Sequence, residues 1–156
     1  MVTIRSAQPA DEAELVRIDL AAETTRSTIR PLTGEPRPFD FDGDVLVAEV
    51  DGALAGYVRL VHPTPFPSSA HVLYVHGLAV DPAVQRRGVG RALVEAAKDR
   101  ARERGMRRLT LRVLAPNEAA RALYAACGFV VEGVFRGEFH LDGEDVDDLF
   151  LAYRVT

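Results

Sequence analysis

A glycine-containing turn between an apolar strand and a helix is the feature that most constrains this chain. Residues 76–98 read HGLAVDPAVQRRGVGRALVEAAK, so an apolar run leads through Gln85-Arg-Arg-Gly-Val-Gly90 into a helical pattern. The first turn of a helix has backbone N–H groups without partners, and the helix dipole places partial positive charge there. Gly88 and Gly90 leave the backbone open to an anion, and three arginines add charge: Arg86, Arg87 and Arg91. The segment therefore predicts a phosphate-binding turn.

Other interpretations of the turn are weaker. A dinucleotide fingerprint needs a third glycine where Leu93 stands, and a P-loop needs a Lys-Ser/Thr pair. An ordinary tight turn remains an alternative for a lone G-x-G. The segment 86–112 carries net charge +7 while the rest of the chain carries −11. This distribution indicates a small polyanionic ligand, and the scarcity of aromatic residues near these arginines argues against nucleic acid.

Length and composition predict an ordinary globular protein. The 156 residues suit a single domain spanning 1–156, with 47% hydrophobic residues and no apolar run near the length of a membrane span. The start V-T-I-R-S lacks a signal-peptide pattern, so we expect a cytoplasmic protein without a membrane partner. Cys127 is the sole cysteine, which excludes an intramolecular disulfide and a cysteine-based zinc site. No metal is expected, and Cys127 is assigned no role.

Hydrophobic periodicity predicts an α/β fold with a mixed sheet. We expect strands at residues 2–7, 45–50, 53–61, 71–80 and 107–114, and a last hairpin within 129–155. Helices are expected at 9–23, 88–104 and 117–127. Asp51-Gly52 and Asp142-Gly143 predict tight hairpin turns. Residues 24–44 contain three prolines and predict a short helix and a loop, which either borders a substrate site or only connects two elements.

The helix over 88–104 is predicted to be amphipathic. Its apolar stripe consists of Val89, Ala92, Leu93, Ala96, Ala97 and Ala101, and its charged residues are expected on the other side. Gly105 is a suitable residue to end it.

Two motifs resemble those of one enzyme family. Gln85-Arg-Arg-Gly-Val-Gly90 is similar to the Q/R-x-x-G-x-G/A pyrophosphate loop of the GNAT N-acetyltransferases. The segment from Asn117 through Tyr124 to Gly128-Phe129 matches the family's N-x-x-A-x-x-x-Y-x-x-x-G-F signature without a gap. The order of predicted elements agrees as well, so the resemblance covers nearly the whole chain. It implies the GNAT acyltransferase fold, with about seven strands and helices on both faces.

The resemblance implies acetyl-CoA as cofactor and places its contacts. In the family, the strand before the loop splays from its neighbour, so that unpaired backbone groups receive the pantetheine arm and an N–H meets the thioester oxygen. The implied contacts are Leu78, Ala79 and Val80 for the arm and the thioester, Gln85, Arg86, Arg87, Gly88, Val89, Gly90 and Arg91 for the pyrophosphate, and Asn117 and Tyr124 beside the arm.

Two residues are candidate catalysts. Tyr124 occupies the position at which the family donates a proton to the leaving thiolate, although it could instead be a core aromatic. His76 lies two residues before Leu78, so regular alternation puts it on the same face, and arylalkylamine acetyltransferases carry a histidine in a similar context. It is the candidate general base, with a satisfied interior histidine as the alternative. Reserve candidates are Tyr74, Glu49 and Glu132.

The acceptor is expected to be the primary amine of a small molecule: an amino acid, an amine or an amino sugar. Acetylation of a protein N-terminus or lysine is the alternative within enzymes, and a non-catalytic CoA-binding sensor is the alternative outside them. A homodimer is kept open. Six acidic residues crowd the last hairpin and either receive a cationic amine or form a solvated edge: Glu138, Asp142, Glu144, Asp145, Asp147 and Asp148.

Overall fold

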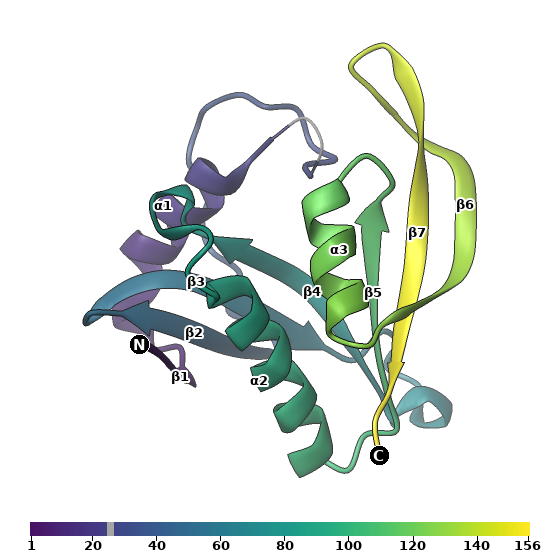
Figure 1. Ribbon diagram of the computed structural model, residues 1–156, viewed down its shortest axis with the longest axis horizontal. Helices are drawn as coiled ribbons and strands as arrows, with labels where there is room; N and C mark the ends of the chain where they lie inside the picture. The colour runs from purple at the N-terminus through teal and green to yellow at the C-terminus, as the bar shows by residue number, and fades with distance from the viewer. Residues whose placement is uncertain (25–26) are drawn as a thin grey trace.

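A computed structural model describes residues 1–24 and 27–156 and shows a seven-stranded sheet in the order β1-β2-β3-β4-β5-β7-β6 (Figure 1). The strands are β1 Val2–Ser6, β2 Asp44–Val50, β3 Ala53–Val61, β4 Val72–Val80, β5 Arg108–Leu114, β6 Val130–Leu141 and β7 Glu144–Arg154. Neighbouring strands pair antiparallel except β4 and β5, which pair parallel. The predicted mixed sheet is confirmed, and β4 is its central strand.

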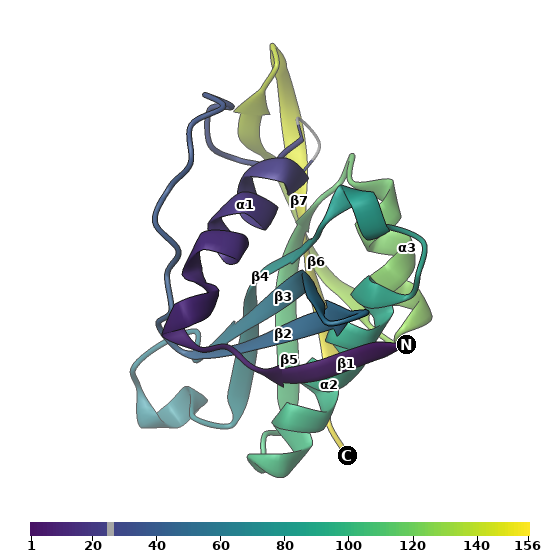
Figure 2. The same ribbon diagram turned by 90° about the vertical axis from the view of Figure 1, so that its left-hand side faces the viewer.

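Helices cover both faces of the sheet. α1 (Glu12–Ala22) follows the short 3-10 turn η1 (Pro9–Asp11) and lies on one face, whereas α2 (Val89–Glu103) and α3 (Glu118–Ala126) lie on the other (Figure 2). Two further 3-10 turns are η2 (Pro67–Ser69) and η3 (Pro82–Val84). No helix in the described ranges is both long and apolar enough to cross a bilayer.

The segment between α1 and β2 departs from prediction. Residues 27–43 run as irregular chain, so the short helix predicted within 24–44 is absent from the described residues, and residues 25 and 26 lie outside them. Prolines without backbone N–H donors at three positions of this segment explain why no helix forms there.

Both predicted hairpin turns are confirmed. Asp51 and Gly52 have φ of 52° and 81°, and Asp142 and Gly143 have φ of 54° and 80°. Two consecutive residues of positive φ match the right-handed twist of the flanking strands. The two Asp-Gly pairs therefore set the register of both hairpins.

Each face of the sheet buries its own core. On the α2 side, Leu93 and Ala97 belong to the same core cluster as the fully buried Leu109 and Leu111 of β5. On the α1 side, Leu15 and Ile18 pack on a cluster that includes Tyr57. Burial of each such leucine contributes about 1.5–3 kcal/mol relative to exposure.

The prediction that the charged residues of α2 face away from the core is wrong for Lys98. It is only 8% exposed, and its Nζ donates to the Cys127 carbonyl oxygen at 2.9 Å and lies 4.4 Å from the centre of the Tyr153 ring. The long lysine stem thus fills apolar space while its ammonium group satisfies the end of α3.

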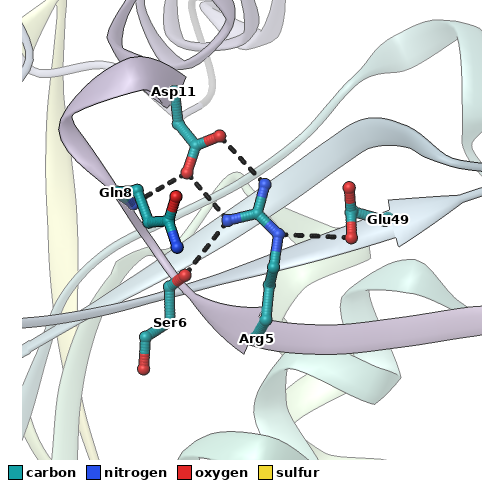
Figure 3. Close-up of polar contacts among 5 residues, drawn as sticks. All are labelled: Arg5, Ser6, Gln8, Asp11 and Glu49. Carbon is teal, nitrogen blue, oxygen red and sulfur yellow. Dashed lines mark hydrogen bonds and ion pairs between the residues drawn. The ribbon is translucent and has the colours of Figure 1, made fainter.

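Arg5 joins three elements at the edge of the sheet. Its guanidinium donates two hydrogen bonds of 2.9 Å to Asp11 of η1 and one of 3.2 Å to Glu49 of β2 (Figure 3). Asp11 also accepts from the Gln8 backbone N–H at 2.8 Å. This network fixes the start of α1 against the first two strands.

Candidate active site

The two central strands separate halfway along their length (Figure 1). β4 pairs with β5 only over Val72–Val75 and Arg108–Leu111. Beyond that point β4 stays paired with β3, and β5 stays paired with β7. Because alternate residues of a strand turn their backbone groups to opposite edges, residues 76–80 present N–H and C=O groups on the β5 side without a ladder partner in the described sheet. The structure thus contains the splayed strand that the resemblance implies, and Leu78, Ala79 and Val80 border the opening.

A β-bulge lies at the apex of this opening. Arg59 of β3 pairs with Gly77, whereas the next residue, Leu60, pairs with Val75, so His76 is an extra residue in β4. The prediction that His76 shares a face with Leu78 is therefore wrong, because one extra residue reverses the alternation. Leu78 packs toward the α2 side, and His76 contacts Arg59 on the α1 side.

The loop that follows β4 presents backbone and arginine groups to solvent. Arg86 and Gly88 have φ of 65° and 78°, and Gly88 caps α2 with no side-chain hydrogen bond. Among the described residues, the first α2 N–H with a backbone acceptor is that of Ala92, bonded to the Gly88 carbonyl at 3.0 Å, so the preceding N–H groups of α2 are open to a ligand. A Cβ added at Gly88 would meet no atom within 4 Å. Arg87 pairs loosely with Asp51 at 3.5 Å.

Gly90 is needed for packing, which the sequence did not indicate. A Cβ at this position would lie 3.1 Å from a Leu123 methyl group and 3.7 Å from Val80. The glycine thus lets α2 and α3 approach each other where β4 ends.

Asn117 and Tyr124 occupy opposite ends of α3. Asn117 caps the helix through its side-chain oxygen, which accepts from the Ala120 N–H at 3.2 Å. The Tyr124 residue is only 7% exposed, and in the described part of the chain its hydroxyl makes no hydrogen bond and keeps some access to solvent. Burial raises the pKa of Tyr124 to about 12, so the phenol is protonated at neutral pH. It is an available proton donor by these criteria.

A charged cluster surrounds His76 on the α1 face. The Arg59 guanidinium donates to His76 Nδ1 at 2.7 Å and to the Asp42 carbonyl at 2.7 Å, and lies 3.3 Å from Asp40. Arg59 is 8% exposed whereas His76 is exposed. Burial, together with the positive charge of Arg59, lowers the pKa of His76. The imidazole is therefore neutral at pH 7.

The reserve candidates for the base are less suitable. Glu49 is bonded to Arg5, and Glu132 is bonded to Arg108, which holds the pKa of Glu132 below its usual value. Both lie away from the opening of β4 and β5. Tyr74 lies nearer, with its ring centre 6.0 Å from that of His76, but burial raises its pKa.

Four of the six acidic residues of the last hairpin already have basic partners. Asp148 and Glu138 pair with Arg112, Asp147 pairs with Arg136, and Asp145 pairs with His140. Arg112 of β5 and Arg136 of β6 thus balance part of the charge of the six carboxylates, and the paired carboxylates are less available to receive a cationic acceptor.

Arg59 is the site residue that sequence reasoning missed. It stands in the apolar run A-G-Y-V-R-L-V of β3, where a lone arginine among buried residues was an available signal. Its neighbour on the same face, Tyr57, donates to the Asp19 carboxylate of α1.

Comparison with known proteins agrees with this geometry. The sequence profile of the acetyltransferase (GNAT) family matches residues 14–129. The chain belongs to the GNAT family. The match spans the divergent strands, the loop and α3, so the elements described above are those that the family shares.

Curated relatives differ in their acceptors. A mycothiol acetyltransferase from Sanguibacter keddieii is 33% identical over 76% of this chain and 35% of its own length. The [ribosomal protein bS18]-alanine N-acetyltransferase of Escherichia coli is 52% identical over 51% of this chain and 53% of its own. An L-2,4-diaminobutyric acid acetyltransferase from Nocardia farcinica is 33% identical over 79% of this chain and 62% of its own. The chain thus spans about a third to two thirds of the length of these relatives.

Solved structures confirm the fold. The smu.2055 protein of Streptococcus mutans superposes with a TM-score of 0.89 at 26% identity, covering 99% of each chain. The acetyltransferase yncA from Salmonella typhimurium, solved with acetyl-CoA, superposes with a TM-score of 0.85 at 24% identity, covering 100% of this chain and 95% of its own.

Proposed function

We propose that this protein is an acetyl-CoA-dependent N-acetyltransferase that acetylates the primary amine of a small molecule. The observation that carries the proposal is the divergence of β4 and β5 beside an open, arginine-bearing helix N-terminus. The divergent strands provide a channel for the extended arm of the cofactor, and the helix N-terminus provides a place for its pyrophosphate.

The residues present fit acetyl-CoA. Free N–H groups at the start of α2, the open surface at Gly88, and the exposed Arg86 and Arg91 would hold the pyrophosphate. Residues 78–80 would hydrogen-bond the pantetheine arm through backbone groups unpaired on the β5 side. The Asn117 amide nitrogen is left available by the helix cap and would contact the same arm.

When bound, acetyl-CoA supplies an activated thioester carbonyl. A backbone N–H of residues 78–80 would stabilise the negative charge that develops on the carbonyl oxygen. Tyr124 would give its proton to the departing thiolate, since the phenol is buried, neutral and without a competing partner.

The Arg59 contact argues against a simple base role for His76. Because arginine only donates, Nδ1 of His76 must accept, and the neutral ring then carries its hydrogen on Nε2. Uptake of a second proton would place a hydrogen on Nδ1 and break the bond to Arg59. We therefore propose that the amine loses its proton to water, and that His76 acts as a hydrogen-bond donor.

The relatives support acyl transfer to amines without deciding the acceptor. One acts by name on a protein N-terminal alanine and another on diaminobutyric acid. Retention of the unpartnered Tyr124 hydroxyl favours catalysis over a CoA-binding sensor, because binding alone does not require a proton donor.

The test is a screen of amino acids, polyamines, arylalkylamines, amino sugars and short peptides, with acetyl-CoA as donor and free thiol as readout. We expect stoichiometric CoA binding and acceptor-dependent thiol release. CoA binding without turnover on any amine would support the sensor instead, and turnover on peptides alone would support a protein acetyltransferase.

A further inference from the structure

Arg59 lies at the apex of the opening, and its ionic partner is an exposed residue. Only Asp40 among the described carboxylates forms an ion pair with it, at 3.3 Å, and the Asp40 side chain is 64% exposed. A buried cation usually requires a close anion, because water does not compensate it. Asp40 therefore stands where a carboxylate from another molecule could bind, and to make room its side chain would give up the 2.9 Å hydrogen bond that its Oδ1 accepts from the Asp42 N–H.

His76 extends this positive surface outward. Its Nδ1 is occupied by Arg59, so the remaining ring nitrogen, Nε2, carries a hydrogen and acts as a donor. The bulge places this exposed side chain on the α1 face, directly after the last residue of β4 that pairs with β5. Arg30 is close enough for its charge to lower the pKa of both His76 and Tyr57, although burial is the larger influence on each group, raising the pKa of Tyr57 and lowering that of His76.

A second arginine at the apex, Arg112, differs from Arg59 in its ionic partners. Arg112 is the first residue of β5 beyond the paired stretch, and two carboxylates, Asp148 and Glu138, bind it while its guanidinium lies 5.0 Å from the centre of the Phe135 ring. Its charge is compensated within the protein. Arg59, on the β3 side of the opening, has by contrast one exposed carboxylate as its ionic partner among the described residues.

We propose that the acceptor is an amine that also carries a carboxylate, as an amino acid does, and that Arg59 and His76 bind this carboxylate in place of Asp40. This proposal rests on the N-acetyltransferase function proposed above. Binding there leaves the amine of the acceptor beside the opening of β4 and β5, where the thioester would lie. The same residues do not favour a peptide N-terminus, whose carboxylate lies many bonds away.

The test compares L-amino acids with their carboxamides, which differ only in the charge of the carboxyl end. The amine of the amide is less basic and more of it is deprotonated, so its chemistry alone would favour the amide. We expect the reverse, with kcat/KM about tenfold to hundredfold higher for the acid, as a charged hydrogen bond would give. Calorimetry with the N-acetyl amino acid, in the presence of CoA, should show the same preference without turnover.

Three variants and a control locate the effect. His76→Leu and Arg59→Gln should reduce the acid-to-amide ratio to about one, whereas Asp40→Asn should raise kcat/KM for the acid roughly threefold to tenfold and leave the amide unchanged. Arg108→Gln, which removes an exposed arginine paired with Glu132, is the matched control and should leave the ratio unchanged. If Arg59→Gln fails to fold, the variants at the exposed residues His76 and Asp40 still test the proposal.

Two outcomes separate this inference from the proposed function. Thiol release that is equal for acids and amides, or an unchanged ratio in both His76→Leu and Asp40→Asn, would overturn the carboxylate site while the acetyltransferase function stands. Absence of thiol release with every amine would overturn the function itself.

Discussion

At the scale of single residues, the surroundings of Tyr124 and His76 determine which proton or hydrogen bond each side chain can give. The Tyr124 side chain is mostly buried, its hydroxyl makes no hydrogen bond among the described residues, and burial raises its pKa so that the phenol is protonated. His76 is exposed but held by Arg59, which occupies the lone pair of Nδ1. One is therefore poised to give a proton, and the other to donate a hydrogen bond without losing its proton.

Tyr124→Phe should lower kcat by about tenfold to hundredfold, because a general acid is removed from the leaving thiolate. Stability should hardly change, since the hydroxyl has no hydrogen-bond partner among the described residues. Single-turnover kinetics with acetyl-CoA and thermal unfolding measure the two quantities. A wild-type rate of chemistry in the variant would return Tyr124 to a packing role.

His76→Gln tests the protonation state of the histidine. Glutamine keeps an N–H donor, so we expect kcat/KM to fall by about tenfold or less. The acidic limb of the pH–rate profile should persist in the variant, because it reflects the amine of the acceptor. The pKa of His76 is lowered, so the wild-type ring gains a proton only below its ordinary value of about 6.5. Loss of the limb in the variant would instead establish His76 as the base.

At the scale of elements, the junction of β4 and α2 requires glycine at two positions, for a different physical reason at each. Gly88 adopts φ of 78° at the helix start and faces open space, whereas a Cβ added at Gly90 would lie 3.1 Å from a methyl group of Leu123 of α3. A large side chain at Gly90 would therefore push α2 and α3 apart, so a substitution there would affect folding as well as ligand binding.

Gly88→Glu is the cleaner probe of the phosphate-binding turn. The new carboxylate would face the pyrophosphate, so the dissociation constant of CoA should rise by at least about tenfold. Gly105→Glu is the matched control, since Gly105 has φ of 71°, faces open space and lies at the opposite end of α2. Both variants carry the backbone cost of about 1–2 kcal/mol for a left-handed residue. Equal CoA affinity of the two variants in calorimetry would contradict the assignment.

The sequence predicts most elements because their signals are local. The Asp-Gly turns, the Asn117 cap and the apolar stripe of α2 each depend on residues close together in the chain. The bulge at His76 could not be predicted, because it arises from a mismatch of register with Arg59 and Leu60 of another strand. The burial of Lys98 and the contact of Gly90 with Leu123 likewise depend on partners from α3 and β7.

At the scale of the whole molecule, the helix α1 must be held against the sheet and the loop that follows β4. Asp81, directly after β4, makes this connection. Its carboxylate accepts from Arg17 of α1 at 2.9 Å and from the Ala83 N–H of η3 at 3.0 Å, and its own N–H donates to Ala55 of β3 at 2.8 Å. One buried carboxylate thus joins the α1 layer, the sheet and the start of the cofactor loop.

Asp81 should make stability sensitive to acid. The Ala83 hydrogen bond, together with Arg17, lowers the pKa of Asp81, so its contribution is complete above the unfolded-state value of about 3.9 and is lost as pH falls through the lower folded value. Asp81→Asn keeps an acceptor for Ala83 and should cost about 1 kcal/mol at pH 7, whereas Asp81→Ala loses both bonds and should cost about 2–3 kcal/mol. Urea unfolding from pH 7 to pH 3 measures both costs, and each should shrink toward the acid end as the wild-type carboxylate is protonated. A wild-type free energy of unfolding in Asp81→Ala at pH 7 would show that other contacts hold α1 against the sheet and the loop after β4.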